Sequence, residues 1–189
     1  MVFDVKDFYP SIKEELLIDA MNFADTLVNI KAKDKEIIHH ARKSLLFNNK
    51  EPWVKKGGNL FDVTMGAYDG AEVCELVGCF MLSIVTSKYN KQNIGLYRDD
   101  GLAVFRCTNG SINDRVKKDF QKTFKNHKLD IVIQCNMTTV DYLGVTLDLS
   151  DGSYRPFQKP NNETNYVHVQ PNHPPNIIKQ IPLSIQTRR

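Results

Sequence analysis

The sequence predicts an α+β protein in which helices pack on one face of an antiparallel sheet. Three observations carry this prediction: short apolar runs alternate with amphipathic stretches, several of the runs come in pairs joined by turn residues, and no internal repeat occurs. The 189 residues, 41% hydrophobic and 25% charged, are enough for a packed domain and exclude a disordered chain. The expected order of elements is β-α-α-β-β-α-β-β-α-β-β-β.

The first predicted elements are a short strand and two helices. Residues 2–5 form the strand, in which apolar neighbours surround Asp4, and we expect this acid to be buried. The spacing of Ser11 and Glu14 is that of a capping box, so it predicts the start of an amphipathic helix. A second helix is expected over 34–46, with its isoleucines facing inward.

The middle of the chain predicts two hairpins and one apolar helix. Residues 53–63 have apolar runs on both sides of a glycine turn, which predicts the first hairpin. Asp69 and Glu72 then have the spacing of a helix cap before a strongly apolar stretch. Two apolar runs within 94–105 flank an Asp-Asp-Gly sequence, which predicts a second hairpin with its turn at those residues.

The C-terminal part predicts a basic helix, three strands and a linker. The helix covers 111–126, and the strands cover 131–133, 142–149 and 154–157. Beyond residue 157 the composition changes to proline, asparagine and glutamine, which is typical of a loop or linker.

Several classes of protein are excluded by the composition. The sequence holds no uncharged apolar run of the roughly 18 residues that a membrane span requires. Acidic Asp4 and Asp7 stand where a signal peptide needs basic and then apolar residues. The four cysteines are spread widely, without the close pairs of a zinc site. We therefore expect an intracellular protein with reduced thiols, in the nucleus or the cytoplasm.

Acidic residues interrupt two of the apolar runs, one at Asp4 and the other at Asp99 and Asp100. A buried carboxylate without a partner is costly, and two adjacent carboxylates repel each other. A divalent cation removes this repulsion, and oxygen ligands that leave room for water and phosphate suit Mg²⁺ better than zinc. The alternative is a plain hairpin turn, because Asp-Gly is a common turn signal.

Four motifs, in the same order, resemble those of the palm domain of reverse transcriptases, and residues 7–12 and 172–179 further resemble the polymerases of mobile retroelements, in particular Penelope-like ones. Residues 3–12 resemble the first palm motif, in which a strand with a catalytic aspartate runs into a helix. Residues 65–70 resemble the motif whose glycine lets the backbone approach the nascent base pair. Residues 97–100 are similar to the Tyr-x-Asp-Asp box, and residues 142–145 to the turn of the primer grip. The resemblance covers roughly residues 1–160 and implies a palm with a ferredoxin-like, RRM-like core.

This resemblance implies an RNA-directed DNA polymerase, a nucleotidyltransferase that adds a nucleotide from a dNTP to the 3′ end of a DNA primer on an RNA template. Its catalytic residues would be Asp4, Asp99 and Asp100. These carboxylates, with the backbone carbonyl of Val5, would hold two Mg²⁺ ions, for which Mn²⁺ could substitute.

The resemblance also implies sites for the nucleotide and for the primer and template. Tyr9 would lie beneath the sugar and exclude a 2′-hydroxyl, and Met65 stands where the family usually has glutamine. A lysine that would protonate pyrophosphate has no clear counterpart in this sequence. The expected nucleotide-binding residues are Asp7, Phe8, Tyr9, Met65 and Gly66, and the expected primer and template residues are Tyr97, Tyr142, Leu143 and Gly144.

Residues 1–157 are assigned by the resemblance to the palm, and residues 158–189 to a Pro/Asn-rich linker and the start of a thumb. It further implies fingers and thumb regions supplied in cis or in trans. Two alternatives remain open: an inactive remnant that only binds nucleic acid, and the palm of an RNA-dependent RNA polymerase. Tyr9 and Tyr97 favour DNA synthesis over RNA synthesis, because an RNA polymerase needs a polar group that recognises the 2′-hydroxyl.

Overall fold

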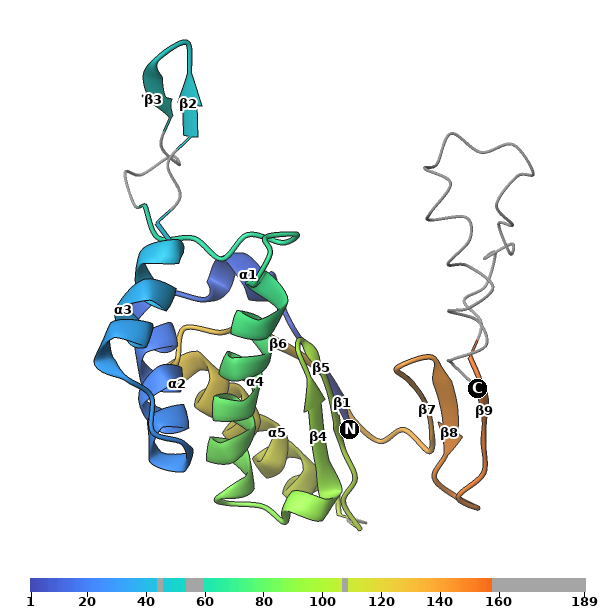
Figure 1. Ribbon diagram of the computed structural model, residues 1–189. Coiled ribbons are helices and arrows are strands. Elements are labelled where there is room, and N and C mark those ends of the chain that lie inside the picture. The colour runs from blue at the N-terminus through green and yellow to red at the C-terminus, as the bar shows by residue number, and fades with distance from the viewer. Residues whose placement is uncertain (44–45, 54–59, 107–108, 158–189) are drawn as a thin grey trace, which may run out of the picture. The chain divides into compact units, whose positions relative to one another are not determined.

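The computed structural model describes residues 1–43, 46–53, 60–106 and 109–157. Met1–Phe157 form one compact unit, built on a four-stranded antiparallel sheet in the order β4-β5-β1-β6 (Figure 1). The strands of this sheet are β1 (Val2–Val5), β4 (Ile94–Tyr97), β5 (Asp100–Ala103) and β6 (Ile131–Gln134). The predicted α+β class, with an antiparallel sheet and packed helices, is confirmed.

Helices cover one face of this sheet and leave the other face open (Figure 1). The layer contains α2 (Glu14–Leu27), α4 (Gly70–Thr86) and α5 (Gly110–Asn126), while α1 (Phe8–Ser11) and α3 (Ala32–Ala41) complete the helices of the described residues. Successive side chains of a strand point to opposite faces. In β1, Phe3 and Val5 are therefore buried under the helices, and Asp4 is exposed on the open face. The expectation that Asp4 is buried is wrong for this reason.

The ring of Phe3 forms the centre of the core. It meets the rings of Phe120 and Phe124 edge to face, with centroids 5.5 and 5.7 Å away. Gly101 lies directly opposite Phe3 on the neighbouring strand β5. A Cβ atom at this position would lie 2.1 Å from the Phe3 ring, so the ring occupies the space of the missing side chain. Gly101 is thus required by close packing within the sheet.

Both predicted helix caps are wrong in their contacts. Ser11 lies inside α1 and its hydroxyl donates to the carbonyl of Lys6 at 3.3 Å, so α2 begins at Glu14 without a side-chain cap. Asp69 does precede α4, but its carboxylate makes no cap hydrogen bond and instead pairs with Arg42. Arg42 is only 5% exposed, and a guanidinium buried to this extent needs an acidic partner.

The region between α2 and α4 differs from the prediction. The helix expected over 34–46 is the shorter α3, and its Ile37 is exposed instead of facing inward. The strand containing Trp53 pairs with the residues before it, so that β2 (Leu46–Asn48) and β3 (Glu51–Trp53) form the hairpin. Its turn residues Asn49 and Lys50 both have positive φ, the geometry that fits the twist of a two-residue hairpin. Residues 54–59, where the glycine turn was predicted, lie outside the described residues.

The last described elements form a three-stranded antiparallel sheet of β7 (Thr139–Tyr142), β8 (Val145–Asp148) and β9 (Tyr154–Pro156). The prediction of one strand over 142–149 is wrong, because Leu143 and Gly144, with φ of 48° and 80°, divide it by a tight turn.

A short 3-10 helix, η1 (Lys91–Asn93), precedes β4. The linker and thumb assignment of 158–189 lies outside the described residues. In the part of the chain that the structure describes, no helix is both long and apolar enough to cross a membrane.

Candidate active site

Three acidic residues lie near one another where β1 and β5 pair. Asp4 is the register partner of Asp100 across this antiparallel pair. The backbone amide of Val5 donates to the carbonyl of Asp99 at 3.0 Å, which fixes the start of the β4–β5 hairpin beside the end of β1. Residues about 95 positions apart in the sequence are thus brought to one edge of the open face.

The electrostatics of this cluster reflect the crowding of like charges. The pKa of Asp4 is raised, first by partial loss of water around its carboxyl group and then by the negative charges of Asp99 and Asp100. A raised pKa means that the ionised form is disfavoured in the folded protein. A cation placed among the three carboxylates would relieve this penalty.

The carboxylates are neighbours, but they are not a closed set of metal ligands. Among the described residues, no three side chains of His, Cys, Asp or Glu stand at positions that could together hold a metal ion. The chemistry of the donors nevertheless fits Mg²⁺, because Asp4, Asp99 and Asp100 supply only oxygen atoms on an open, solvent-accessible face.

The turn of the β4–β5 hairpin lies closer to the N-terminus than the sequence predicts. Arg98 and Asp99 form the turn, Arg98 with φ of 54°, while Asp100 and Gly101 already belong to β5. Gly101 therefore serves packing against Phe3 and is no turn glycine. The alternative of a plain Asp-Gly turn does not describe this hairpin, since the turn precedes Asp100.

Tyr9 lies beside the carboxylates, at the point where α1 approaches the start of α4. A Cβ atom on Gly70 would lie 3.6 Å from the Tyr9 ring, and the Tyr9 hydroxyl shares a hydrogen bond with the Cys74 thiol. The pKa of Tyr9 is raised, mainly by burial, and it responds to the charges of Arg98 and Asp99. The structure thus brings Tyr9 close to the carboxylate edge and half-buries its ring.

The other predicted nucleotide-site residues differ in exposure and in backbone conformation. Met65 is 75% exposed, and Gly66 has φ of 86° with open space around it, so this glycine is needed for its backbone conformation. Asp7 precedes α1 in the left-handed conformation. The side chain of Phe8 is buried in the core, which leaves only its backbone for a ligand.

Of the predicted primer and template residues, Tyr142 is tied directly to the carboxylate hairpin. Its hydroxyl donates to the backbone carbonyl of Asp100 at 3.3 Å. Burial and the Asp100 charge both raise the pKa of Tyr142. Leu143 and Gly144 form the adjacent turn, and Tyr97 is half-exposed beneath the guanidinium of Arg98, 5.2 Å from its ring centroid.

Three residues around Tyr9 were missed by the sequence reasoning. The guanidinium of Arg98 bonds Glu75 of α4 at 3.2 Å, and Cys74 contacts the Tyr9 hydroxyl. Burial raises the pKa of the Cys74 thiol to about 11, so it remains protonated and unreactive. Glu75 carried a usable signal, because it is a lone acid in an otherwise apolar helix segment.

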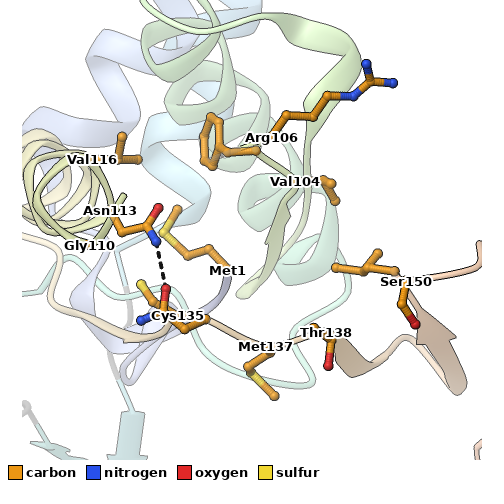
Figure 2. Close-up of a pocket in the computed structure, with 13 residues that line it drawn as sticks. Met1, Val104, Arg106, Gly110, Asn113, Val116, Cys135, Met137, Thr138 and Ser150 are labelled. Carbon is orange, nitrogen blue, oxygen red and sulfur yellow. Dashed lines mark hydrogen bonds between the residues drawn. The ribbon is translucent and has the colours of Figure 1, made fainter. Parts of the chain in front are cut away.

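A pocket of about 730 Å³ lies at the other end of the sheet (Figure 2). It is lined by residues that follow β5 and β6 and by the first turns of α5, among them Arg106, Asn113 and Met137. The side-chain amide of Asn113 donates to the side-chain oxygen of Asn136 at 2.7 Å. None of the predicted site residues lines this pocket. Its separation from the carboxylates means that it plays no part in the candidate active site.

The charge crowding at Asp4 predicts a pH-dependent stability. The pKa of Asp4 is higher in the folded than in the unfolded protein. The free energy of unfolding therefore falls as pH rises from the unfolded pKa through the folded pKa. We therefore expect Asp4→Asn to raise the melting temperature in metal-free buffer at pH 7, and to have little effect near pH 3. Thermal melts from pH 3 to 8 measure this, and a destabilising effect at pH 7 would contradict the crowding.

Comparison with known proteins supports a fold relationship and no more. No protein-family model matches the chain, and no curated protein matches it. Among solved structures, it is similar to apo telomerase from Candida tropicalis truncated from its C-terminal domain, with a TM-score of 0.54 and 11% sequence identity. The match covers 82% of this chain and 35% of the telomerase chain, so the present chain spans about a third of that protein.

Proposed function

We propose that this chain is the palm of an RNA-directed DNA polymerase of the reverse-transcriptase type. The observation that carries the proposal is the register of β1 and β5, which sets Asp4 opposite Asp100 with Asp99 adjoining. The likeness of the fold to telomerase supports a distant relationship to this class of enzyme. The retroelement origin, Penelope-like in particular, rests on the sequence motifs alone.

In this proposal Asp4, Asp99 and Asp100 hold Mg²⁺, with the carbonyl of Val5 as a further oxygen donor. When bound, two such ions supply charge stabilisation for the attacking and leaving oxygens of nucleotidyl transfer. The chain's own residues orient the reactants: Tyr9 forms the floor beneath the sugar, and Asp7 and Phe8 offer backbone amides. Tyr142, bonded to Asp100, braces the hairpin from the side on which the primer end would lie.

Two alternatives make different predictions. An RNA-dependent RNA polymerase would need a polar group to recognise the 2′-hydroxyl, whereas the half-buried ring of Tyr9 is suited to exclude it. An inactive remnant would bind nucleic acid without using the carboxylates. The pKa of Asp4 is raised by partial loss of water and then by the charges of Asp99 and Asp100, and this favours an active site over a remnant, because carboxylates without a task gain nothing from being held together.

The experiment that tests the proposal combines metal binding with catalysis. We expect millimolar Mg²⁺ to raise the melting temperature of the chain, since a ligand of the folded state stabilises it by mass action. A labelled DNA primer annealed to an RNA template should then be extended in the presence of Mg²⁺ and dNTPs. If neither Mg²⁺ nor Mn²⁺ changes the melting temperature, the proposed site is contradicted.

Sugar selection separates the two polymerase classes. Removal of the Tyr9 ring opens space beneath the sugar without touching a carboxylate, so Tyr9→Ala should raise the use of ribonucleotides relative to deoxynucleotides about ten- to a hundredfold, which corresponds to roughly 1.4–2.8 kcal/mol. Parallel extension reactions with dNTPs and rNTPs measure the ratio. Tyr9→Phe keeps the ring and loses only the bond to Cys74, so it should retain the wild-type ratio. An unchanged ratio in Tyr9→Ala would leave Tyr9 as a core residue only.

A further inference from the structure

Helix α5 presents a row of cations on the side that faces away from the sheet. Four basic residues follow one another at steps of three and four: Arg115, Lys118, Lys122 and Lys125. At 3.6 residues per turn these positions fall within an arc of about 80°, so their side chains project in nearly the same direction. All four are exposed. We call these four residues the α5 ridge.

The opposite face of α5 fixes the direction of the ridge. Phe120 and Phe124 are buried and contact the ring of Phe3 in β1, which turns this face of the helix toward the sheet. Asp4, one residue later in β1, points to the open face of the same sheet. The ridge and the carboxylates therefore face in opposite directions, with the helix layer and the sheet between them. The ridge is no part of the candidate active site.

The positive charge of the ridge is largely uncompensated by the protein. Lys125 has an ion pair with Asp130 at a long 3.9 Å. Among the described residues, none of the ion pairs involves Arg115, Lys118 or Lys122. Two acids of α5 flank the ridge: Asp114, which borders a shallow depression together with Arg115 and Lys118, and Asp119, which is four residues after Arg115. Asp119 is engaged by Lys88 and the Tyr89 hydroxyl.

We propose that the α5 ridge binds the phosphate backbone of a nucleic-acid strand, as a second contact surface independent of the carboxylate site. From Arg115 to Lys125 the helix rises about 15 Å, which gives one cation per roughly 5 Å. Along one strand of a duplex the phosphates follow at about 3.4 Å of axis, so lysine and arginine side chains can reach successive phosphates. None of the four residues of the α5 ridge is apolar, whereas a stable interface with a protein has an apolar centre. A nucleic acid therefore fits the ridge better than an acidic protein.

The ridge proposal does not rest on the polymerase proposal, and the two can fail separately. The ridge variant is Arg115→Gln with Lys118→Gln and Lys122→Gln. The matched control is Lys31→Gln with Lys33→Gln and Lys91→Gln, which removes the same charge from exposed lysines elsewhere. Lys125 is left unchanged because it pairs with Asp130.

Binding of a fluorescein-labelled 20-nucleotide RNA and of a 20-base-pair DNA duplex is measured by anisotropy between 50 and 200 mM KCl. Each phosphate contact contributes about 0.9 to the slope of log affinity against log salt for duplex DNA, and about 0.7 for a single strand. For the ridge variant, the slope of log affinity against log salt should therefore be smaller in magnitude by about 2 to 3. Its affinity at 50 mM salt should be at least about tenfold lower. The control should keep the wild-type slope.

Equal slopes for the ridge variant and the control would overturn the proposal. So would competition by poly-glutamate as effective as that by RNA at equal charge, because that result would assign the ridge to an acidic protein. Melting temperatures of both variants check that the fold is retained. The ridge variant should keep the wild-type response of the melting temperature to Mg²⁺, because its three positions lie apart from the carboxylates.

Discussion

Replacement of Asp99 by asparagine is expected to abolish primer extension, with a loss of at least about a thousandfold. Asparagine keeps the shape of the side chain and the backbone bond from Val5, but removes the charge that would hold a divalent cation. A loss of about 4 kcal/mol in transition-state stabilisation gives this factor, at roughly 1.4 kcal/mol for each tenfold change. Extension rates of wild type and variant, measured at saturating Mg²⁺, provide the comparison.

Two further measurements connect this loss to the carboxylate cluster. Asp99→Asn should shrink the rise in melting temperature that Mg²⁺ produces in the wild type, since one ligand and one charge are gone. Without metal the variant should melt above the wild type, because the Asp99 charge, which after partial burial helps to raise the pKa of Asp4, is gone. Asp19→Asn, an exposed acid on α2, is the matched control and should extend the primer normally. Equal extension by Asp99→Asn and Asp19→Asn would refute the role of Asp99.

Gly101→Ala is expected to destabilise the fold by about 2–3 kcal/mol, the upper part of the range for overpacking a core. The added methyl group would lie 2.1 Å from the Phe3 ring, and this ring cannot withdraw, because Phe120 and Phe124 contact it edge to face. Urea unfolding of the wild type and the variant measures the change. Gly110→Ala is the control, since nothing lies within 4 Å of its added carbon, and its cost should be near zero.

A second substitution tests whether the cost at Gly101 arises from Phe3. Phe3→Leu alone removes part of the buried ring and destabilises the core. In the double variant, the smaller leucine leaves room for the alanine, so the two costs should sum to more than the measured total by about 1 kcal/mol or more. Full additivity would show that Gly101 is required for some reason other than the approach of the Phe3 ring.

Local patterns were sufficient to predict the helices and strands of the sheet core. The apolar run at residues 2–5, the apolar helix after Asp69 and the basic helix before residue 126 all correspond to elements of the structure, β1, α4 and α5. Such segments are predictable as elements because each has a marked apolar or amphipathic pattern, although the pattern of residues 2–5 did not show that Asp4 is exposed. The tight turn at Leu143 and Gly144 was predicted only by the resemblance to the primer grip, since the apolar pattern of 142–149 predicted one unbroken strand.

The particular partners of several side chains and strands could not be predicted from these local patterns. Ser11 and Asp69 have the right spacing for caps, yet the first bonds the backbone of Lys6 and the second a buried arginine far away in sequence. The buried guanidinium of Arg42 requires a carboxylate, and this demand outweighs a cap that α4 can lose at a cost of about 1 kcal/mol. Trp53 likewise pairs with the residues before it, because a two-residue turn closes at less entropic cost than a longer loop.

The candidate site likewise has features that the sequence predicts and features that only the tertiary structure decides. The sequence by itself determined the candidate residues: the carboxylates within apolar strands are visible without a fold, and the resemblance to a polymerase palm adds Tyr9, while the roles of all four stay predictions. Only the tertiary structure decided that Asp4 is exposed, that Asp100 is its register partner, and that Gly101 serves the Phe3 ring and not a turn. The reason is physical: the pairing of β1 with β5 joins segments about 95 residues apart, and their register is chosen by the packing of Phe3 against the helices, which no local sequence pattern contains.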